Sequence, residues 1–157
     1  MSSTNADHCS SRDTQRIYFA RAVDGIDREL TMSSGQSLAA EFDECGFILV
    51  DPLLTEPVRD GPYSAEDWYR LVVQHDLAVL RSCAGVLMDM SIPFRNYIGC
   101  SCELVYAHLW KIPTVVFMGE NDMDRPWLRY HASAVVRTRS EAVSRLKSLL
   151  DDGIRPA

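Results

Sequence analysis

Short apolar runs recur along the chain and are separated by longer stretches of mixed polarity. Each run is shorter than an ordinary helix and is bounded by polar residues, glycine or proline, so it predicts a buried strand. The predicted strands cover residues 16–20, 45–51, 84–90, 113–119 and 133–138.

Four of the intervening stretches predict helices, at residues 33–44, 64–83, 101–111 and 140–152. The clearest apolar pattern at helical spacing lies in the second, at Trp68, Leu71, Val72, His75, Val79 and Cys83. Serines mark three of the starts, and the predicted N-caps are Ser33 or Ser34, Ser64 and Ser140. Asp67 follows Ser64 at the spacing of a capping pair.

The alternation of strands and helices, without two-residue hairpin turns, predicts a parallel sheet covered on both faces. We expect an α/β fold with a five-stranded, doubly wound parallel sheet of the flavodoxin-like or Rossmann-like type. One domain is expected over residues 16–153, and residues 1–15, rich in Ser, Asp and Asn, are expected to be disordered. Ligands of such folds bind at the carboxyl ends of the strands, here residues 20–25, 51–54, 89–99 and 119–127.

Composition and charge narrow the class of partner. The chain has 157 residues, of which 46% are hydrophobic and 24% charged, as expected of one soluble globular domain. Its formal net charge of -6 argues against binding nucleic-acid polymers, which needs a basic surface, but leaves nucleosides and nucleotides open. No stretch approaches the ~18 apolar residues of a membrane span, so no membrane partner is expected.

The five cysteines are odd in number, and the polar start of the chain lacks the apolar core of a signal peptide. We therefore expect a reduced, cytoplasmic setting. Cys100 and Cys102 form a C-x-C pair without a second pair, which favours small buried residues at a helix start over a zinc site. Neither a metal nor a cofactor is expected.

A candidate reactive group stands in the apolar run "GCSCELVYAHLWKIP", residues 99–113, whose one carboxylate is Glu103. Glu103 is predicted in the first turn of a helix, where the helix dipole favours an ionised carboxylate. We expect Asp76 on the preceding helix, Asp89 at the end of the third strand and Tyr18 in the first strand to line the same pocket.

Such a pocket suits cleavage of an N-glycosidic bond. One carboxylate attacks or stabilises the sugar carbon, and an acidic group handles the proton at the leaving base. Ordinary roles compete with these: carboxylates at helix starts are commonplace, Asp76 can lie on the solvated side of its helix, and Tyr18 can pack in the core. His75 is interpreted as a helix-face residue.

Three segments carry a family resemblance: "IYFA" (17–20), "HDLAVLRSCAGVLMDM" (75–90) and "GCSCELVYAHLWKIPTVVF" (99–117). They resemble the nucleoside 2-deoxyribosyltransferase family, whose superfamily includes nucleoside 5′-monophosphate N-glycosidases. The resemblance covers roughly residues 16–138, and its specific part is the E-L-x-x-A block with the flanking strands.

The resemblance implies roles for the matching residues. Glu103 matches the glutamate that forms a covalent glycosyl-enzyme, and Asp76 matches an aspartate that transfers a proton or orients the substrate. Tyr18 matches an aromatic residue of the nucleoside pocket, and Asp89 an acidic or polar strand-end position. Residues 125–133 match a segment that enters a neighbouring subunit's site, so we expect a homodimer or higher homo-oligomer with shared sites.

The chain also departs from the family pattern. Val105 replaces the glycine two residues after the glutamate, and Lys111-Ile112-Pro113 replaces G-K-P. Phosphate-binding members carry a small hydroxyl and an arginine after the first strand, where this chain has Ala22 and Asp24. Asp24 would repel a 5′-phosphate, which favours a nucleoside as the small-molecule substrate. A phosphate would require a substitute cation, taken from Arg21, Arg95 or Arg129.

Further candidates for substrate binding lie outside this core. Asn96 and Tyr97 are expected to face sugar hydroxyls, and Gly99 with the helix start offers backbone N–H donors. Trp127 either stacks on a base or anchors its loop. His131 is either a ligand contact or a structural histidine.

Three hypotheses follow. The first is a transferase or hydrolase acting on the N-glycosidic bond of a nucleoside, and the second is a nucleoside 5′-monophosphate N-glycosidase. The third is a nucleotide-binding module without turnover, with Val105 crowding the site.

Overall fold

The computed structural model describes residues 15–23, 26–57, 59 and 61–153. The tail expected to be disordered lies outside them except for Gln15, which opens the first strand and was wrongly placed in the tail. Asp24 also lies outside the described residues. In the part of the chain that is described, no helix is both long and apolar enough to cross a membrane.

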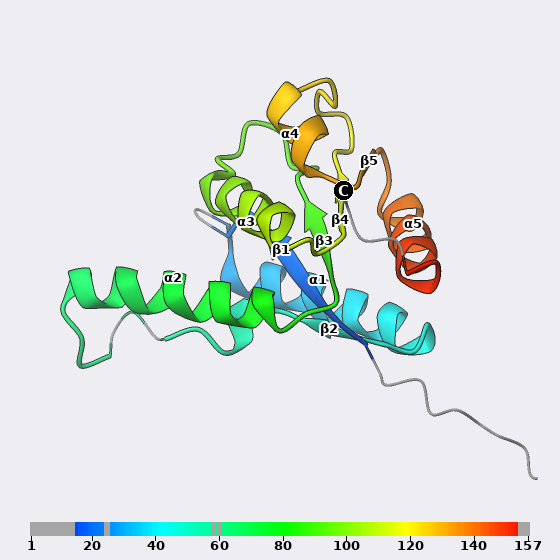
Figure 1. The fold of residues 1–157 in the computed structure, drawn as a ribbon. Coiled ribbons are helices and arrows are strands. Elements are labelled where there is room, and N and C mark those ends of the chain that lie inside the picture. Colours follow the sequence, from blue (N-terminus) through cyan, green and yellow to red (C-terminus); the bar gives the residue numbers. More distant parts are fainter. Residues whose placement is uncertain (1–14, 24–25, 58, 60, 154–157) are drawn as a thin grey trace, which may run out of the picture.

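A five-stranded parallel sheet forms the centre of the fold, as predicted (Figure 1). Its strands are β1 (Gln15–Arg21), β2 (Phe47–Val50), β3 (Gly85–Asp89), β4 (Thr114–Phe117) and β5 (Ala134–Val136). The spatial order is β2-β1-β3-β4-β5, which is the flavodoxin-like order. The order of the strands reverses between β1 and β3, so this pair marks the switch point where ligands bind in such folds.

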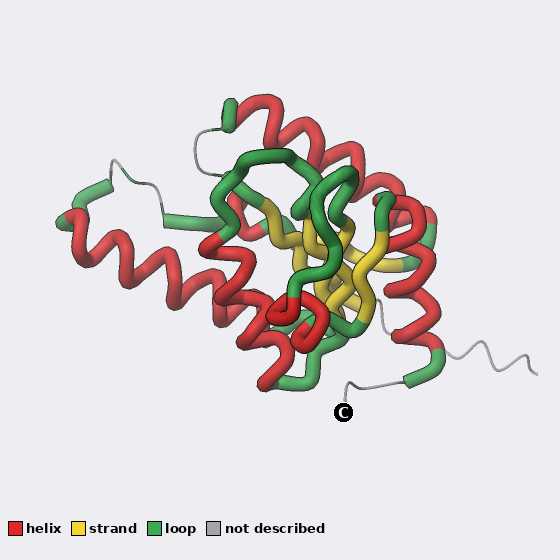
Figure 2. Tube along the Cα trace, turned by 90° about the horizontal axis from the view of Figure 1, so that it is seen from above, coloured by secondary structure: helices red, strands yellow, loops and turns green. Residues whose placement is uncertain are grey.

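Helices cover both faces of the sheet (Figure 2). On one face α1 (Arg28–Glu44) and α5 (Arg139–Asp151) enclose a core with the inward side chains of β1, β3 and β4. On the other face lie α2 (Ala65–Arg81), α3 (Ile98–Leu109) and α4 (Pro126–His131). The second core contains Tyr18 and is the layer from which the candidate site is built.

Two predicted helix N-caps were wrong. Helix α1 begins at Arg28 because the Asp27 side chain accepts a hydrogen bond from the Leu30 amide at 3.0 Å, so Ser33 and Ser34 lie inside the helix. Its first turn was missed because Leu30, although apolar, is exposed and does not belong to the buried face that the later apolar residues form. Helix α5 begins after Thr138, which forms a capping box with Glu141, and Ser140 is not its cap. Ser64 is confirmed as the cap of α2.

Two short elements lie in segments where no helix was predicted. A 3-10 helix, η1, spans Pro52–Leu54 and is capped by Asp51. Helix α4 spans Pro126–His131 and has proline in its first turn, where a missing N–H costs no hydrogen bond. Because it is so short, α4 gives too few apolar repeats for a helical period to be recognised.

Strand parity sends Arg21 to the α1 side of the sheet. Ile17 and Phe19 of β1 face α1 and α5, whereas Tyr18 faces α2 and α3, and Arg21 follows the odd positions. Its guanidinium pairs with Asp51 at 2.5 Å and lies over the Phe19 ring, and both charged side chains are buried. Burial lowers the pKa of Arg21 and raises that of Asp51, while their mutual attraction opposes both changes.

Gly35 of α1 makes room for this ion pair. A Cβ at residue 35 would lie 2.7 Å from Asp51 Oδ2 and 2.8 Å from Arg21 Nη1. Gly35→Ala is therefore expected to lower the free energy of unfolding by about 1–3 kcal/mol, although alanine normally stabilises a helix interior. Gly99→Ala in α3 should instead raise it by about 0.5–1 kcal/mol, because no described atom lies within 4 Å of that Cβ. Urea denaturation measures both, and equal signs would contradict this account.

Candidate active site

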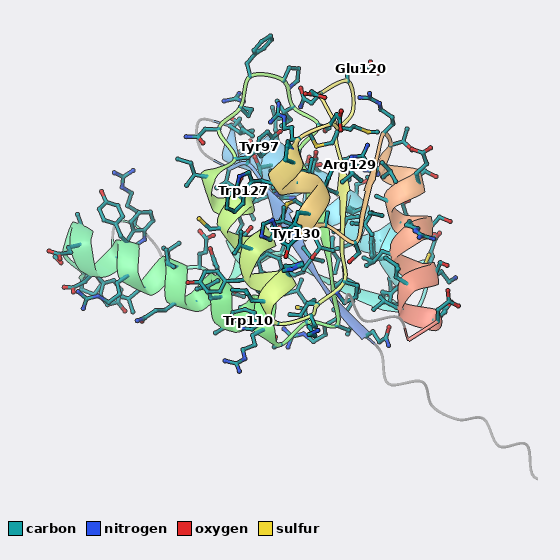
Figure 3. The ribbon with its side chains drawn as sticks, turned by 45° about the horizontal axis from the view of Figure 1, so that its top comes forward. Tyr97, Trp110, Glu120, Trp127, Arg129 and Tyr130 are labelled. Atoms are coloured by element: carbon teal, nitrogen blue, oxygen red, sulfur yellow. The ribbon has the colours of Figure 1, made fainter. Side chains whose placement is uncertain are left out.

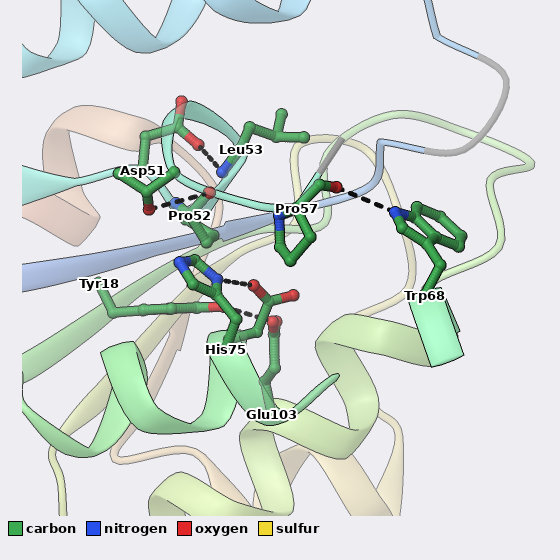
Figure 4. A network of polar contacts seen from close by, with 10 residues as sticks. Tyr18, Asp51, Pro52, Leu53, Pro57, Trp68, His75 and Glu103 are labelled. Atoms are coloured by element: carbon green, nitrogen blue, oxygen red, sulfur yellow. Dashed lines mark hydrogen bonds and ion pairs between the residues drawn. The ribbon is translucent and has the colours of Figure 1, made fainter. Parts of the chain in front are cut away.

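A hydrogen bond between Tyr18 and Glu103 joins the sheet to α3 at the switch point. The Tyr18 hydroxyl donates to Glu103 Oε1 at 2.6 Å (Figure 4). The Tyr18 side chain is fully buried, and Glu103 as a whole residue is partly exposed. The hydrogen bond fixes the orientation of Glu103 through Oε1 and does not engage its second oxygen, as a nucleophile requires.

The electrostatic setting of Glu103 differs from the one predicted. Because α3 begins at Ile98 and not at residue 101, Glu103 lies in the second turn, where the helix dipole has little effect. Burial raises the pKa of Glu103 to about 7, and the charges of Asp76 and Glu56 act in the same direction. The Tyr18 hydrogen bond lowers this pKa in part. The carboxyl is thus poised between its two forms near neutral pH.

Asp76 approaches the same place from α2. Its Oδ1 lies 3.0 Å from Nδ1 of His75, and Figure 4 shows His75, Tyr18 and Glu103 converging. Burial raises the pKa of Asp76, and the hydrogen bond and charge of His75 oppose that rise. The charge of Asp76 in turn raises the pKa of Tyr18 and of Glu103. The three residues expected to form the centre of the site are therefore neighbours.

A cavity of about 280 Å³ lies next to the first turns of α2. Its lining comes from the segments around α1, η1 and α2, namely Val23, Ile26, Thr31, Leu53, Glu56, Pro57, Arg59 and Trp68. Tyr18, Asp76 and Glu103 are not among the described lining residues, but the charge of Glu56, which lines the cavity, raises the pKa of Glu103. The volume lies just below the range of about 300–1,000 Å³ for small-molecule sites.

Trp68 and Pro57 form one wall of this cavity. The Trp68 indole N–H donates to the Pro57 carbonyl at 2.9 Å, and the Arg59 guanidinium lies 5.5 Å from the Trp68 ring centre. This bond ties the segment after η1 to the first turns of α2. No site role was predicted for Glu56, Arg59 or Trp68, because they lie in or next to a proline-rich segment without a recognisable motif spacing.

The candidates between β3 and α3 hold their own loop together. Asp89 Oδ1 accepts hydrogen bonds from the Ser91 amide at 2.9 Å and from its hydroxyl at 2.6 Å. The Tyr97 hydroxyl bonds to the Ile92 amide and carbonyl, both at 3.0 Å. Asn96 Oδ1 accepts from the backbone N–H of residue 98 at 3.1 Å. These bonds shape the approach to α3, and their roles toward a substrate stay predictions, as does that of Gly99.

Arg21 does not share the space around Glu103. Its ion pair with Asp51 lies under α1, on the opposite face of the sheet from Tyr18. This position runs against its expected role as a substrate contact and against its use as a substitute phosphate ligand. Alternation along β1 contained the signal, because residue 21 has the parity of Phe19 and not of Tyr18.

Trp127 and His131 lie on the other flank of α3. Both belong to α4, where their rings stack at 5.4 Å, and Figure 3 shows Trp127 and Tyr130 over α3. A second cavity of about 290 Å³ lies under α4, and its wall includes Ser101 and Val105 of α3. Since Ser101 and Val105 are each two residues from Glu103, they point to the other side of the helix. Val105 therefore does not crowd the Tyr18–Glu103 contact.

Comparison with solved structures identifies the fold. A 2-deoxyribosyltransferase from the psychrotolerant bacterium Bacillus psychrosaccharolyticus matches with a TM-score of 0.62, at 15% identity, over 80% of this chain and 88% of that one. The chain has the fold of a 2-deoxyribosyltransferase. The flavodoxin-like architecture and the likeness expected from the three sequence segments are thereby confirmed at the level of fold.

Two further structures share this deoxyribosyltransferase fold. A conserved protein from Enterococcus faecalis V583 has a TM-score of 0.66 at 13% identity, over 87% of this chain and 99% of that one. The CMP N-glycosidase BcmB of Clostridium botulinum has a TM-score of 0.52 at 12% identity, over 89% of this chain and its own full length. No protein-family profile matches the sequence, and no curated protein matches it significantly.

Proposed function

We propose that the protein is an enzyme of the nucleoside 2-deoxyribosyltransferase superfamily that cleaves the N-glycosidic bond of a nucleoside, with Glu103 as the nucleophile. The observation that carries the proposal is the 2.6 Å bond from Tyr18 to a half-buried Glu103 at the switch point of the sheet. The neighbouring Asp76 and the shared fold support it. A carboxylate held in this way leaves its second oxygen for attack on a sugar carbon.

The proposed reaction proceeds in two steps. In the first, an oxygen of ionised Glu103 bonds to the anomeric carbon, the bond from that carbon to the base nitrogen breaks, and Asp76 protonates the departing base. In the second, water or another base attacks the same carbon, releases Glu103 and returns a proton to Asp76. Water makes the protein a hydrolase, and a base makes it a transferase.

The Tyr18 hydroxyl has a defined part in this chemistry, because it stabilises the ionised form of Glu103. Base release is expected to fall as the pH drops below about 7 and Glu103 takes up a proton. In Tyr18→Phe the pKa of Glu103 rises further, so this acidic limb of kcat/KM moves to higher pH. Tyr106 is a partly exposed residue of α3, the helix that carries Glu103. The control variant Tyr106→Phe should leave the acidic limb in place. An unmoved limb in Tyr18→Phe would argue against the assigned contact.

The function itself is tested with a panel of nucleosides and their 5′-monophosphates, each with and without a free acceptor base, and with released or exchanged base detected by chromatography. Release from nucleosides supports the proposal, and exchange distinguishes a transferase from a hydrolase. No release or exchange from any member of the panel would overturn it.

A nucleoside 5′-monophosphate N-glycosidase is the second candidate. Arg59 favours it, because this cation lines the cavity next to Glu56 and is placed to meet a phosphate, unlike the buried Arg21. The fold shared with a CMP N-glycosidase gives further support. Cleavage of the monophosphates alone would select this candidate. A nucleotide-binding module without turnover stays a third hypothesis, but Val105 does not support it by crowding the site, since Val105 lines the cavity under α4.

We further propose that the enzyme is a homo-oligomer whose copies share sites. Trp127 and Tyr130 of α4 are 76% and 72% exposed, so this surface has apolar area for a second copy to cover. Residues 125–133 would then reach a neighbouring site and not their own.

A further inference from the structure

The adjacent residues His75 and Asp76 form a hydrogen-bonded pair that the proposed reaction has so far used only in part. Nδ1 of His75 lies 3.0 Å from Oδ1 of Asp76, and their side chains are 23% and 17% exposed. Consecutive residues of a helix do not normally face each other. Here the two side chains contact each other, and Figure 4 shows His75 on the side of α2 that faces Tyr18 and Glu103.

The surroundings of the pair are acidic. The charge of Asp76 acts on two titratable groups of other elements, Tyr18 of β1 and Glu103 of α3. The charge of Glu56, after η1, also acts on Glu103. His75 brings to this centre a group that can carry a positive charge. Its protonation therefore decides whether Glu103 faces a net negative or a neutral pair.

The proposed reaction makes two opposing demands on this centre. Glu103 must have lost its proton to attack the sugar carbon, whereas the departing base needs a proton donor close by. A lone Asp76 meets these demands poorly, because its ionised form raises the pKa of Glu103 and carries no proton to give. A histidine bonded to Asp76 removes the conflict, since the pair can hold a proton and stay neutral overall.

We propose that His75 is a positioning residue that shares one proton with Asp76, so that the two act as a single proton donor which is electrically neutral toward Glu103 until the base departs. This inference rests on the proposed function. As the glycosidic bond breaks, the shared proton passes to the base nitrogen and leaves neutral His75 beside the Asp76 carboxylate. In the second step the pair regains the proton from the incoming water or acceptor base, so the proton count closes over one turnover.

The His75→Asn variant tests this role in the full-length protein. An asparagine amide nitrogen can occupy the place of Nδ1 and still donate to Asp76, but it holds no extra proton. The acidic limb of the rate profile is expected to move to higher pH and the alkaline limb to lower pH. Because the two limbs of the bell-shaped pH profile then lie closer together, the maximum of kcat should fall about tenfold or more. A purely structural role would lower the rate equally at all pH values without moving either limb, and that result would overturn the inference.

A second measurement does not depend on turnover. Carboxyl carbon NMR titrations are compared between the wild-type chain and His75→Asn. Loss of the imidazolium is expected to raise the pKa of both Asp76 and Glu103, whereas the exposed Glu141 of α5 serves as an unmoved control. Absence of base release by the wild type would count against the proposed function, while unmoved titrations of Asp76 and Glu103 would overturn the inference about His75.

Discussion

The Glu103→Gln variant is expected to release base about a thousandfold or more slowly than the wild-type chain. Glutamine keeps the shape of the side chain and an oxygen that accepts the Tyr18 hydrogen bond, but it cannot form a glycosyl ester that turns over. Removing a covalent nucleophile costs roughly 10³-fold or more in rate in enzymes of this kind. The rate of base release at saturating substrate measures the effect directly.

Measurements of stability distinguish a loss of chemistry in Glu103→Gln from a loss of folding. The pKa of Glu103 is raised from 4.5 to about 7, so the folded chain favours its protonated form. Its contribution to stability is therefore present at low pH and is lost as the pH rises through about 7. Glu103→Gln should gain stability over the wild type more at pH 8 than at pH 5. Glu44→Gln, on the exposed end of α1, should leave both rate and stability unchanged. A fast Glu103→Gln enzyme would refute the nucleophile.

Breaking the ion pair under α1 is expected to give the largest loss of stability. Arg21→Met leaves Asp51 as an uncompensated buried charge, and Asp51→Leu does the same to Arg21. Each single change should lower the free energy of unfolding by about 3–5 kcal/mol. The double variant should recover most of that loss, because both charges are removed together.

A surface ion pair provides the matched control for this cycle. Arg139 and Glu41 lie 3.2 Å apart, with side chains 45% and 37% exposed. Arg139→Met is expected to cost less than about 1 kcal/mol, because solvent screens exposed charges. Chemical denaturation of the five proteins settles the comparison. A double variant as unstable as the sum of the single ones would show that the Arg21–Asp51 pair is not the unit described here.

The strands were predictable because burial on both faces gives short apolar runs, and each lies within two residues of its predicted range. Helix α2 was predictable because Ser64 caps it and its apolar spacing is regular. The start of α1 was not predictable, because Leu30 in its first turn is exposed and does not continue the buried apolar face of the helix. Helix α4 is too short for its period to be recognised. The local sequence pattern therefore located an element correctly where its buried apolar residues and its capping residue indicate the same bounds.

The centre of the candidate site was predictable for a related reason. Tyr18, Asp76 and Glu103 sit on a strand and two helices whose order along the chain places them at one switch point. Arg21 was misjudged because parity along β1 was not applied to it. Glu56 was missed because its position depends on how the loop after η1 folds back over α2, which Trp68 fixes through a bond between distant residues.

The most direct test of the central claim is a mass measurement on the acid-quenched protein. The wild-type chain is mixed with a nucleoside that it cleaves, fluorinated at C2 of the sugar to slow breakdown of the glycosyl-enzyme. We expect the protein to gain the mass of one sugar residue, carried on the peptide that contains Glu103, and no gain in Glu103→Gln. Release of base without any adduct, or an adduct carried on another residue, would contradict the account.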